Sequence, residues 1–329
     1  MARSGTWVFA RRWLAITCAL AIAGPATLGG QSARYDSSVV SVSGSGSTTF
    51  VLITGVVGGV AGFRRLASLL EPNHRVVIID PYRLAVDSAD VTFAALARNV
   101  DRVLGELGVD SARVVGHAHG AGVALRLAVN APSRVTELYF LDAGAYDENR
   151  TKGFSSSLKW ASLIVKFPGG RNFVRGRFAR GLRQNSGRQE WLDSATLREY
   201  TDPVVNQLSK AISLAKRLER AREPESYLTL ADRVQVPVTV LLGAAPHPAE
   251  PDSAEITALA PLGDRLRIEH LAGVGHFPHE EAPAEVAAYL LAGTTAGGGH
   301  SDPWRLHAPA VTPVQPASGL DQQASTRCP

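Results

Sequence analysis

Short runs of apolar and β-branched residues recur through the middle of the chain, each bounded by glycine, proline or polar residues. Such runs predict strands that are buried within a sheet. The predicted strands cover residues 50–53, 75–80, 113–115, 135–142, 236–243 and 265–270.

Apolar residues at helical spacing separate these strands. Helices are predicted after the first run (63–70), over 91–107, where Gly108 ends the pattern, and over 121–129. Strands alternating with helices predict an α/β fold with a mostly parallel, doubly wound sheet covered on both faces. Ligands bind such sheets beyond the carboxyl ends of the strands. The residues predicted there are Thr54, Ala118, Asp142 and Gly243.

One long segment interrupts this alternation. Residues 145–228 contain helical patterns, including 158–165 and 204–218, but no predicted strand. We therefore expect a helical cap over the binding edge of a core formed by residues 49–144 and 229–292.

The two ends of the chain differ from this core. Residues 1–33 combine arginines, an apolar run over 13–23 and small residues at Ala21 and Ala23, which is typical of a cleaved export signal. The run is short for a bilayer span, which needs about 20 residues, so an uncleaved anchor is the alternative. We predict a periplasmic or extracellular protein with a flexible lead-in over 34–48 and a disordered tail over 293–329.

Positive charge is concentrated in the predicted cap. Residues 150–222 hold 16 Lys and Arg against 5 Asp and Glu, whereas the rest of the chain holds 18 against 25. Three interpretations stay open: a solvated helix face, contact with an anionic membrane surface or envelope polymer, and steering of an anionic substrate. An exported protein is not expected to bind nucleic acid.

The positions of the cysteines and of a glycine-rich turn argue against several kinds of site. The chain has two cysteines, Cys18 and Cys328, both in the end segments, so no disulfide, thiolate nucleophile or cysteine-based metal site is expected in the core. The glycine-rich turn 55–62 has neither the Lys-Ser/Thr of a P-loop nor the G-x-G-x-x-G spacing. We therefore expect no cofactor or metal, and a turn whose backbone approaches a neighbour closely.

Residues 114–122, Val-Val-Gly-His-Ala-His-Gly-Ala-Gly, have the outline of a nucleophile elbow. This sharp strand-to-helix turn needs small residues, here Gly116 and Gly120, and presents one side chain at its tip. The tip residue is Ala118. Its methyl group can neither attack a carbonyl carbon nor give up a proton.

In the order of these parts, residues 49–291 resemble the α/β-hydrolase superfamily, in particular its lidded esterase, epoxide-hydrolase and carbon–carbon-bond-hydrolase branch. The resemblance rests on the elbow and on the segment Gly273-Val274-Gly275-His276-Phe277 before the last helix. It implies that His276 is the general base and that the backbone N–H groups of Val56 and His119 form an oxyanion hole. His117 is expected to be a packing residue.

The resemblance also implies an acid that orients His276. Thr54 stands where the family has a His before Gly, and Pro246 stands near the usual position of the acid, beside His247. Neither Pro246 nor His247 can replace a carboxylate. Asp142 is the candidate acid, since some branches place it there, and the alternative is that Asp142 only caps a turn.

Three functions are compatible with this sequence. The first is an exported hydrolase-fold protein that has lost acyl-enzyme chemistry and binds a small apolar or carboxylated ligand under its cap. The second is an enzyme, such as a lyase, a cofactor-free oxygenase or a hydrolase, that uses His276 as a base without a nucleophile. The third is an envelope protein that uses its basic cap for binding.

Overall fold

The computed structural model of the chain describes residues 35–145 and 154–293. The predicted export signal, the first residues of the cap and nearly all of the predicted tail lie outside these residues. None of the helices in the described ranges is long and apolar enough to cross a bilayer.

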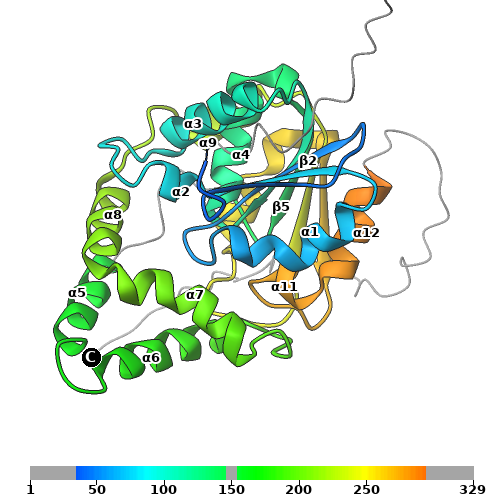
Figure 1. Cartoon of the computed structure of the whole chain (residues 1–329). Coiled ribbons are helices and arrows are strands. Elements are labelled where there is room, and N and C mark those ends of the chain that lie inside the picture. The colour runs from blue at the N-terminus through cyan, green and yellow to red at the C-terminus, as the bar shows by residue number, and fades with distance from the viewer. Residues whose placement is uncertain (1–34, 146–153, 294–329) are drawn as a thin grey trace, which may run out of the picture. The chain divides into compact units, whose positions relative to one another are not determined.

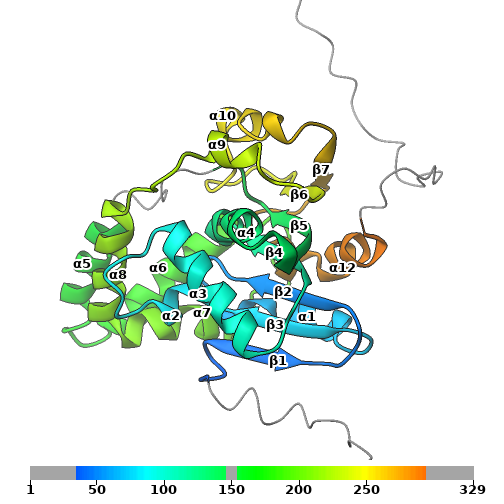
Figure 2. The same cartoon turned by 90° about the horizontal axis from the view of Figure 1, so that it is seen from above.

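A seven-stranded sheet forms the centre of the molecule, in the order β1-β3-β2-β4-β5-β6-β7. All neighbouring strands run parallel except β1 and β3, which are antiparallel. Figure 2 shows β1 and β7 at the two edges. The strands are β1 (Val40–Ser43), β2 (Thr49–Ile53), β3 (Arg75–Ile79), β4 (Ala112–His117), β5 (Val135–Leu141), β6 (Val238–Gly243) and β7 (Leu266–Leu271).

Helices cover both faces of the sheet, as the predicted α/β class requires (Figure 1). One face packs against α3 (Phe93–Glu106), α4 (His119–Asn130) and α9 (Tyr227–Ala231). The other packs against α1 (Arg64–Leu70) and α12 (Pro283–Ala292). The shorter helices are η3 (Val60–Phe63), α2 (Pro81–Leu84), η4 (Pro132–Arg134), α10 (Ser253–Thr257), η5 (Ala260–Arg265) and α11 (Pro278–Glu281).

Four helices between β5 and α9 form the cap. They are α5 (Phe154–Ile164), α6 (Gly170–Gln184), α7 (Ser194–Asn206) and α8 (Leu208–Arg220). The cap has its own small hydrophobic core, which includes Leu158, Val174 and Val205. In both cartoon views these helices gather on the side of the sheet away from α12 (Figures 1 and 2).

The segment before β2 is partly regular, and the glycine-rich turn after β2 packs closely against the cap. The lead-in over 34–48 is not wholly irregular, because Val40–Ser43 forms β1 and pairs with Val76–Ile79. Alternation between a buried Val40 and half-buried neighbours over only four residues is too short a signal to separate from a linker. The glycine-rich turn does approach a neighbour closely, since a Cβ atom at Gly58 would lie 2.8 Å from the Tyr200 ring of the cap.

Candidate active site

The elbow between β4 and α4 has the geometry that its sequence predicts. Ala118 has φ 48° and ψ −121°, a conformation that costs a non-glycine residue on the order of 1–3 kcal/mol. A Cβ at Gly116 would lie 2.5 Å from the carbonyl oxygen of Gly120, and one at Gly120 would lie 2.5 Å from that of Ile53. The strained turn is therefore kept, although its tip carries only a methyl group.

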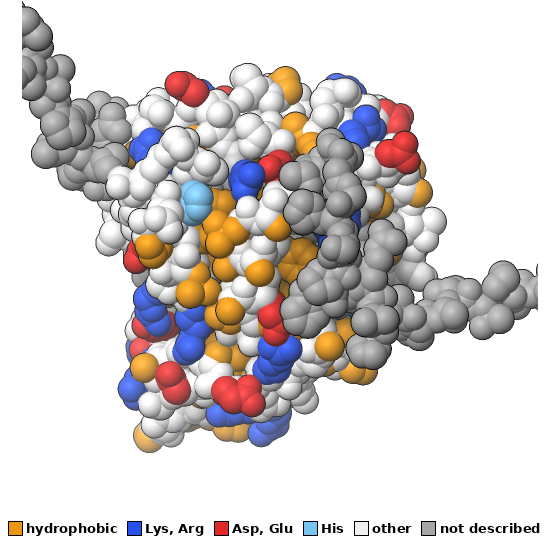
Figure 3. All heavy atoms as spheres, turned by 90° about the vertical axis from the view of Figure 1, so that its right-hand side faces the viewer, with side chains coloured by type: hydrophobic (Ala, Val, Ile, Leu, Met, Phe, Trp, Pro, Cys, Tyr) orange, Lys and Arg blue, Asp and Glu red, His pale blue; other side chains and the backbone are white. Residues whose placement is uncertain are grey.

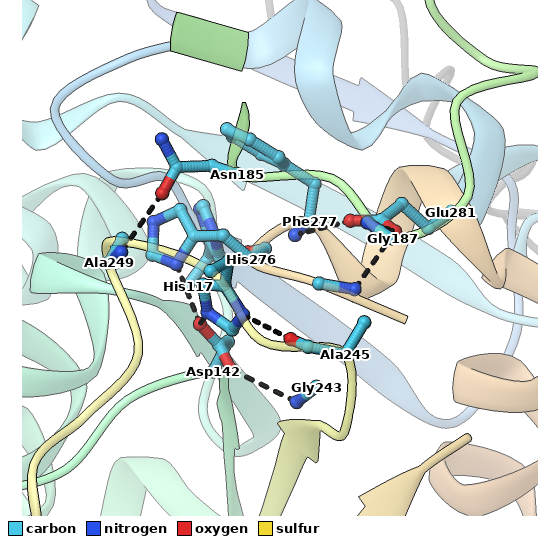
Figure 4. Close-up of polar contacts among 12 residues, drawn as sticks. His117, Asp142, Asn185, Gly187, Gly243, Ala245, Ala249, His276, Phe277 and Glu281 are labelled. Atoms are coloured by element: carbon cyan, nitrogen blue, oxygen red, sulfur yellow. Dashed lines mark hydrogen bonds and ion pairs between the residues drawn. The ribbon is translucent and has the colours of Figure 1, made fainter. Parts of the chain in front are cut away.

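His276 and Asp142 meet beside the elbow (Figure 4). The Nδ1 atom of His276 lies 2.7 Å from Oδ2 of Asp142, which follows the last residue of β5. The other oxygen, Oδ1, accepts a hydrogen bond of 3.0 Å from the backbone N–H of Gly243 at the end of β6. Parallel strands thus deliver the carboxylate and its anchor to one edge of the sheet.

The environment of Asp142 favours its charged form. Burial by itself would raise the pKa of this fully buried carboxyl group, but hydrogen bonds from His247 and His276 hold that pKa well below its ordinary value. A carboxylate can only accept hydrogen bonds. We therefore assign the ring hydrogen of neutral His276 to Nδ1, which leaves Nε2 as the basic nitrogen.

His247 makes a second contact with the same carboxylate oxygen. Its Nε2 atom lies 2.8 Å from Oδ2 of Asp142, and its Nδ1 atom lies 2.8 Å from the carbonyl oxygen of Ala245. Both partners are acceptors, so both ring nitrogens carry hydrogens when both contacts are hydrogen bonds, and the ring is then an imidazolium. Burial acts to lower the pKa of His247, but the hydrogen bonds to Asp142 and Ala245 and the nearby negative charges together outweigh burial, so the pKa is raised.

Two further histidines close the back of the site as neutral rings. Burial lowers the pKa of His117 to about 3 and that of His279 well below its ordinary value. The Nε2 atom of His117 lies 2.8 Å from the carbonyl oxygen of His276, which fixes the loop backbone. This agrees with the packing role expected for His117.

A cavity of about 710 Å³ lies between the elbow and the cap. Its floor includes Ala118 and His276 together with both predicted oxyanion-hole residues, Val56 and His119. His119 is the first residue of α4, where backbone N–H groups point towards the helix N-terminus and favour a negative charge. The cap contributes mostly apolar side chains, among them Leu158, Trp160, Ile164, Phe173, Val174, Phe178 and Leu182.

Glu281 and Asn185 hold the His276 loop in place, and sequence reasoning missed both. Glu281 accepts hydrogen bonds from the backbone N–H groups of Gly187, Gly275 and Phe277, at 2.8, 2.9 and 3.1 Å (Figure 4). The carbonyl oxygen of Asn185 accepts a 2.7 Å hydrogen bond from the N–H of His276. The cap thus helps to position the base. The available signal was a pair of acidic residues directly after the His loop, but sequence alone does not show that they are buried.

Asp142, His247 and His276 also form the one group of three His, Cys, Asp or Glu side chains within the described ranges that has ligand atoms close enough for a metal ion. The Asp142 oxygen lies 2.7 and 2.8 Å from the two nitrogens. Two ligands on one Zn²⁺, each at about 2.0–2.1 Å in tetrahedral geometry, would be about 3.3 Å apart. The observed spacing fits shared hydrogens better than a shared cation.

The structure brings together all five residues singled out from the sequence: Ala118, Val56, His119, Asp142 and His276. His247 does not replace the acid, in agreement with the expectation. It contacts the acid directly, which the sequence did not predict.

Comparisons with known proteins agree with this architecture. A family model described as the Alpha/beta hydrolase family matches residues 39–289. Among solved structures, an α/β-hydrolase-fold protein from Burkholderia ambifaria superposes with a TM-score of 0.60 at 19 % identity, covering 77 % of this chain and 93 % of the other. At that identity the likeness concerns the fold alone.

Curated relatives match over shorter segments. A 2-hydroxy-6-oxononadienedioate/2-hydroxy-6-oxononatrienedioate hydrolase from a Pseudomonas species is 26 % identical over 122 residues, which are 34 % of this chain and 42 % of the relative. The dihydrolipoyllysine-residue acetyltransferase component of the acetoin cleaving system from Cupriavidus necator is 33 % identical over 121 residues, 35 % of this chain and 32 % of the relative. The matched segments thus span less than half of these relatives. With the family model covering most of its length, the chain belongs to the α/β-hydrolase family.

Proposed function

We propose that this protein binds a small apolar compound that carries a carbonyl group, and that His276 acts on it directly as a general base, without an acyl-enzyme. The hydrogen bond of 2.7 Å between His276 and the buried Asp142 carries this proposal. An Asp–His pair that orients the ring and stabilises its charged form is what proton transfer requires.

Ala118 excludes the covalent route at the elbow. A methyl group offers no nucleophile, and loss of the serine in a well-studied protease lowers turnover by about 10⁶. The N–H groups of Val56 and His119 do not depend on side chains, so they support stabilisation of a negatively charged oxygen. The apolar cavity wall favours a substrate with little charge beyond that oxygen.

The reaction that follows is enolisation. Nε2 of His276 removes a proton from the carbon next to the carbonyl group, the electron pair moves onto the carbonyl oxygen, and the two N–H groups stabilise the enolate. Return of a proton from the imidazolium to the carbon completes the exchange. Membership of the α/β-hydrolase family is also consistent with reactions in which hydrolysis follows the same proton transfer to His276.

Deuterium exchange tests this function. The full chain is incubated in D₂O with 4-phenyl-2-butanone, an apolar ketone, and loss of the proton signals next to the carbonyl group is followed by NMR. We expect exchange above the level seen with the His276→Ala variant, and a loss of that excess in Asp142→Asn. Equal rates for wild type and His276→Ala across a set of apolar ketones would refute base catalysis.

A binding protein without catalysis is the second candidate, and it is favoured by Ala118 together with the apolar cap wall of the cavity. It predicts that an uncharged apolar fluorophore such as Nile red binds equally to wild type and to His276→Ala, while no ketone exchanges. A cavity-filling Ala161→Phe variant provides the control, because Ala161 lines the cavity from the cap.

A further inference from the structure

Large apolar side chains are exposed on the cap beside the cavity. Trp160 is 69 % exposed, Leu163 52 % and Phe167 70 %, and they follow one another at spacings of three and four residues on α5 and just beyond it. Trp160 and Leu163, three residues apart, lie on one face of α5, and Phe167 follows in the turn after this helix. Phe173 on the neighbouring helix α6 is 61 % exposed. A soluble surface seldom gathers such side chains without a partner.

Two of these side chains lie at the mouth of the cavity. Trp160 and Phe173 are both largely exposed and both line the cavity that reaches Ala118 and His276. The cavity therefore opens between α5 and α6, through the exposed apolar surface. No Asp or Glu is among the described residues that line the cavity, so an apolar compound that reaches this surface enters the site without passing acidic side chains.

The charge of this region indicates what the surface contacts. Residues 154–189, which include α5 and α6, contain eight Lys and Arg and no Asp or Glu. Arg175 pairs with Asp202 and Arg188 with Glu285, but among the described residues no acidic side chain pairs with Lys159 or Lys166. Both lysines are exposed and adjoin the apolar side chains.

The side of the molecule opposite the cap has a different distribution of charged and apolar side chains. Figure 3 shows the face on the side of α12, where orange hydrophobic atoms are accompanied by both blue and red charged side chains. Exposed leucines occur outside the cap as well, at Leu69 on α1 and Leu291 on α12, 44 % and 45 % exposed. Leu69 and Leu291 each stand alone as the exposed large apolar side chain of their helix, and Arg64 and Arg65 of α1 are paired with Glu199 and Glu280. On α5, α6 and the turn between them, four such side chains gather among basic residues without an acidic residue in the segment.

We propose that α5 and α6 dock on an anionic phospholipid bilayer, with Trp160, Leu163, Phe167 and Phe173 inserted at the interface and the basic side chains against the headgroups. Exposed aromatic and aliphatic residues beside lysine and arginine are the features of interfacial membrane binding. Each basic group near an anionic surface strengthens binding about fivefold at physiological salt. The docked cavity mouth faces the acyl chains, so an apolar ligand passes from the bilayer into the site. This docking does not require His276 to be catalytic.

Quenching of Trp160 fluorescence tests the docking. The full chain is mixed with vesicles of dibrominated phosphatidylcholine, with or without about 30 % phosphatidylglycerol. The Trp160 signal is the fluorescence of the full chain minus that of its Trp160→Phe variant. This subtraction removes the signal of the other tryptophans and the contribution of any binding through the apolar segment near the N-terminus. We expect quenching on the anionic vesicles, and much less on neutral vesicles or at high salt.

Paired variants separate the two contributions. Leu163→Ser/Phe167→Ser changes apolar side chains that are not in the cavity lining, and we expect it to reduce partitioning roughly tenfold or more. Lys159→Gln/Lys166→Gln should do the same on anionic vesicles. Leu69→Ser/Leu291→Ser is the matched control and should partition as the wild type does.

Three results would overturn the proposal. They are an unquenched Trp160 on anionic vesicles, equal quenching on neutral ones, and unchanged partitioning of the Leu163→Ser/Phe167→Ser variant. A dimer in sedimentation that these two substitutions dissociate, without quenching by vesicles, would instead assign the surface to a second copy of the chain.

Discussion

The substitution Asp142→Asn tests the hydrogen bonds on which the basic nitrogen of His276 depends. Asp142 accepts hydrogen bonds from both imidazole rings on one oxygen and from the N–H of Gly243 on the other. An asparagine has one acceptor oxygen and one NH₂ donor, so it cannot accept on both sides. If its oxygen keeps the bond to Gly243, its NH₂ group faces the rings, and Nδ1 of His276 must lose its hydrogen to accept.

The expected magnitude follows from this exchange of donors. His276 then carries its hydrogen on Nε2 and is no longer a base towards the cavity. The same exchange in a Ser–His–Asp protease lowers turnover about 10⁴-fold, equivalent to about 5 kcal/mol, and we expect a loss of that order in base-dependent exchange. The buried ion pair with His247 is also lost, so unfolding should become easier by about 3–5 kcal/mol near pH 6.

Long-range ¹H–¹⁵N correlation spectra of the full chain provide the assay, because they identify which ring nitrogen of a neutral histidine carries the hydrogen. We expect Nδ1–H for His276 in the wild type and Nε2–H in Asp142→Asn. Asp80→Asn is the control, since Asp80 is also buried after a strand but accepts from the N–H groups of Tyr82 and Arg83. The reasoning fails if His276 has the same tautomer in wild type and Asp142→Asn.

Three further changes should alter stability in defined ways. Because the folded pKa of His247 is raised, its pairing with Asp142 stabilises the fold fully below about pH 6.5 and less as pH rises, so the loss of thermal stability in His247→Phe should shrink from pH 6 to pH 9. Burial raises the pKa of Glu280 to about 7, so the folded state holds its proton more tightly than the unfolded state and stability falls by about 3 kcal/mol between pH 4.5 and 7. Glu280→Gln should lack this decline in denaturant titrations. Glu223→Gln leaves the buried guanidinium of Arg126 without its carboxylate, and calorimetry should show a loss of about 3–5 kcal/mol, whereas a change below 1 kcal/mol would contradict that pairing.

Most of the fold follows from local pattern. Strands buried on both faces are continuous apolar runs, so β2, β3 and β5 were predicted to within one residue at each end. β1 was missed because an edge strand of four residues with two serines carries almost no pattern. The cap was predicted from a long stretch with helical spacing and without strands.

The site was predictable only where a motif fixes it. Ala118 and His276 lie in segments whose spacing identifies them. No such motif identifies the acid. Asp142 was a candidate only through the family resemblance, because it meets His276 and His247 across 134 and 105 residues of sequence. Those contacts depend on how the loops after β5, β6 and β7 fold towards one another. No local pattern in a single sequence gives the distances between side chains on different loops. The same holds for Glu281, whose partners include the cap backbone.

Labelling with a fluorophosphonate probe tests the central claim most directly, namely that the site keeps its base and oxyanion donors and lacks only a nucleophile. Wild type, Ala118→Ser and Ala118→Ser/Asp142→Asn are exposed to the probe as full chains. We predict that Ala118→Ser is labelled, that the wild type is not, and that the added Asp142→Asn sharply slows labelling. Labelling of the wild type that disappears in His276→Ala, or an Ala118→Ser variant that folds but stays unlabelled, would contradict the account.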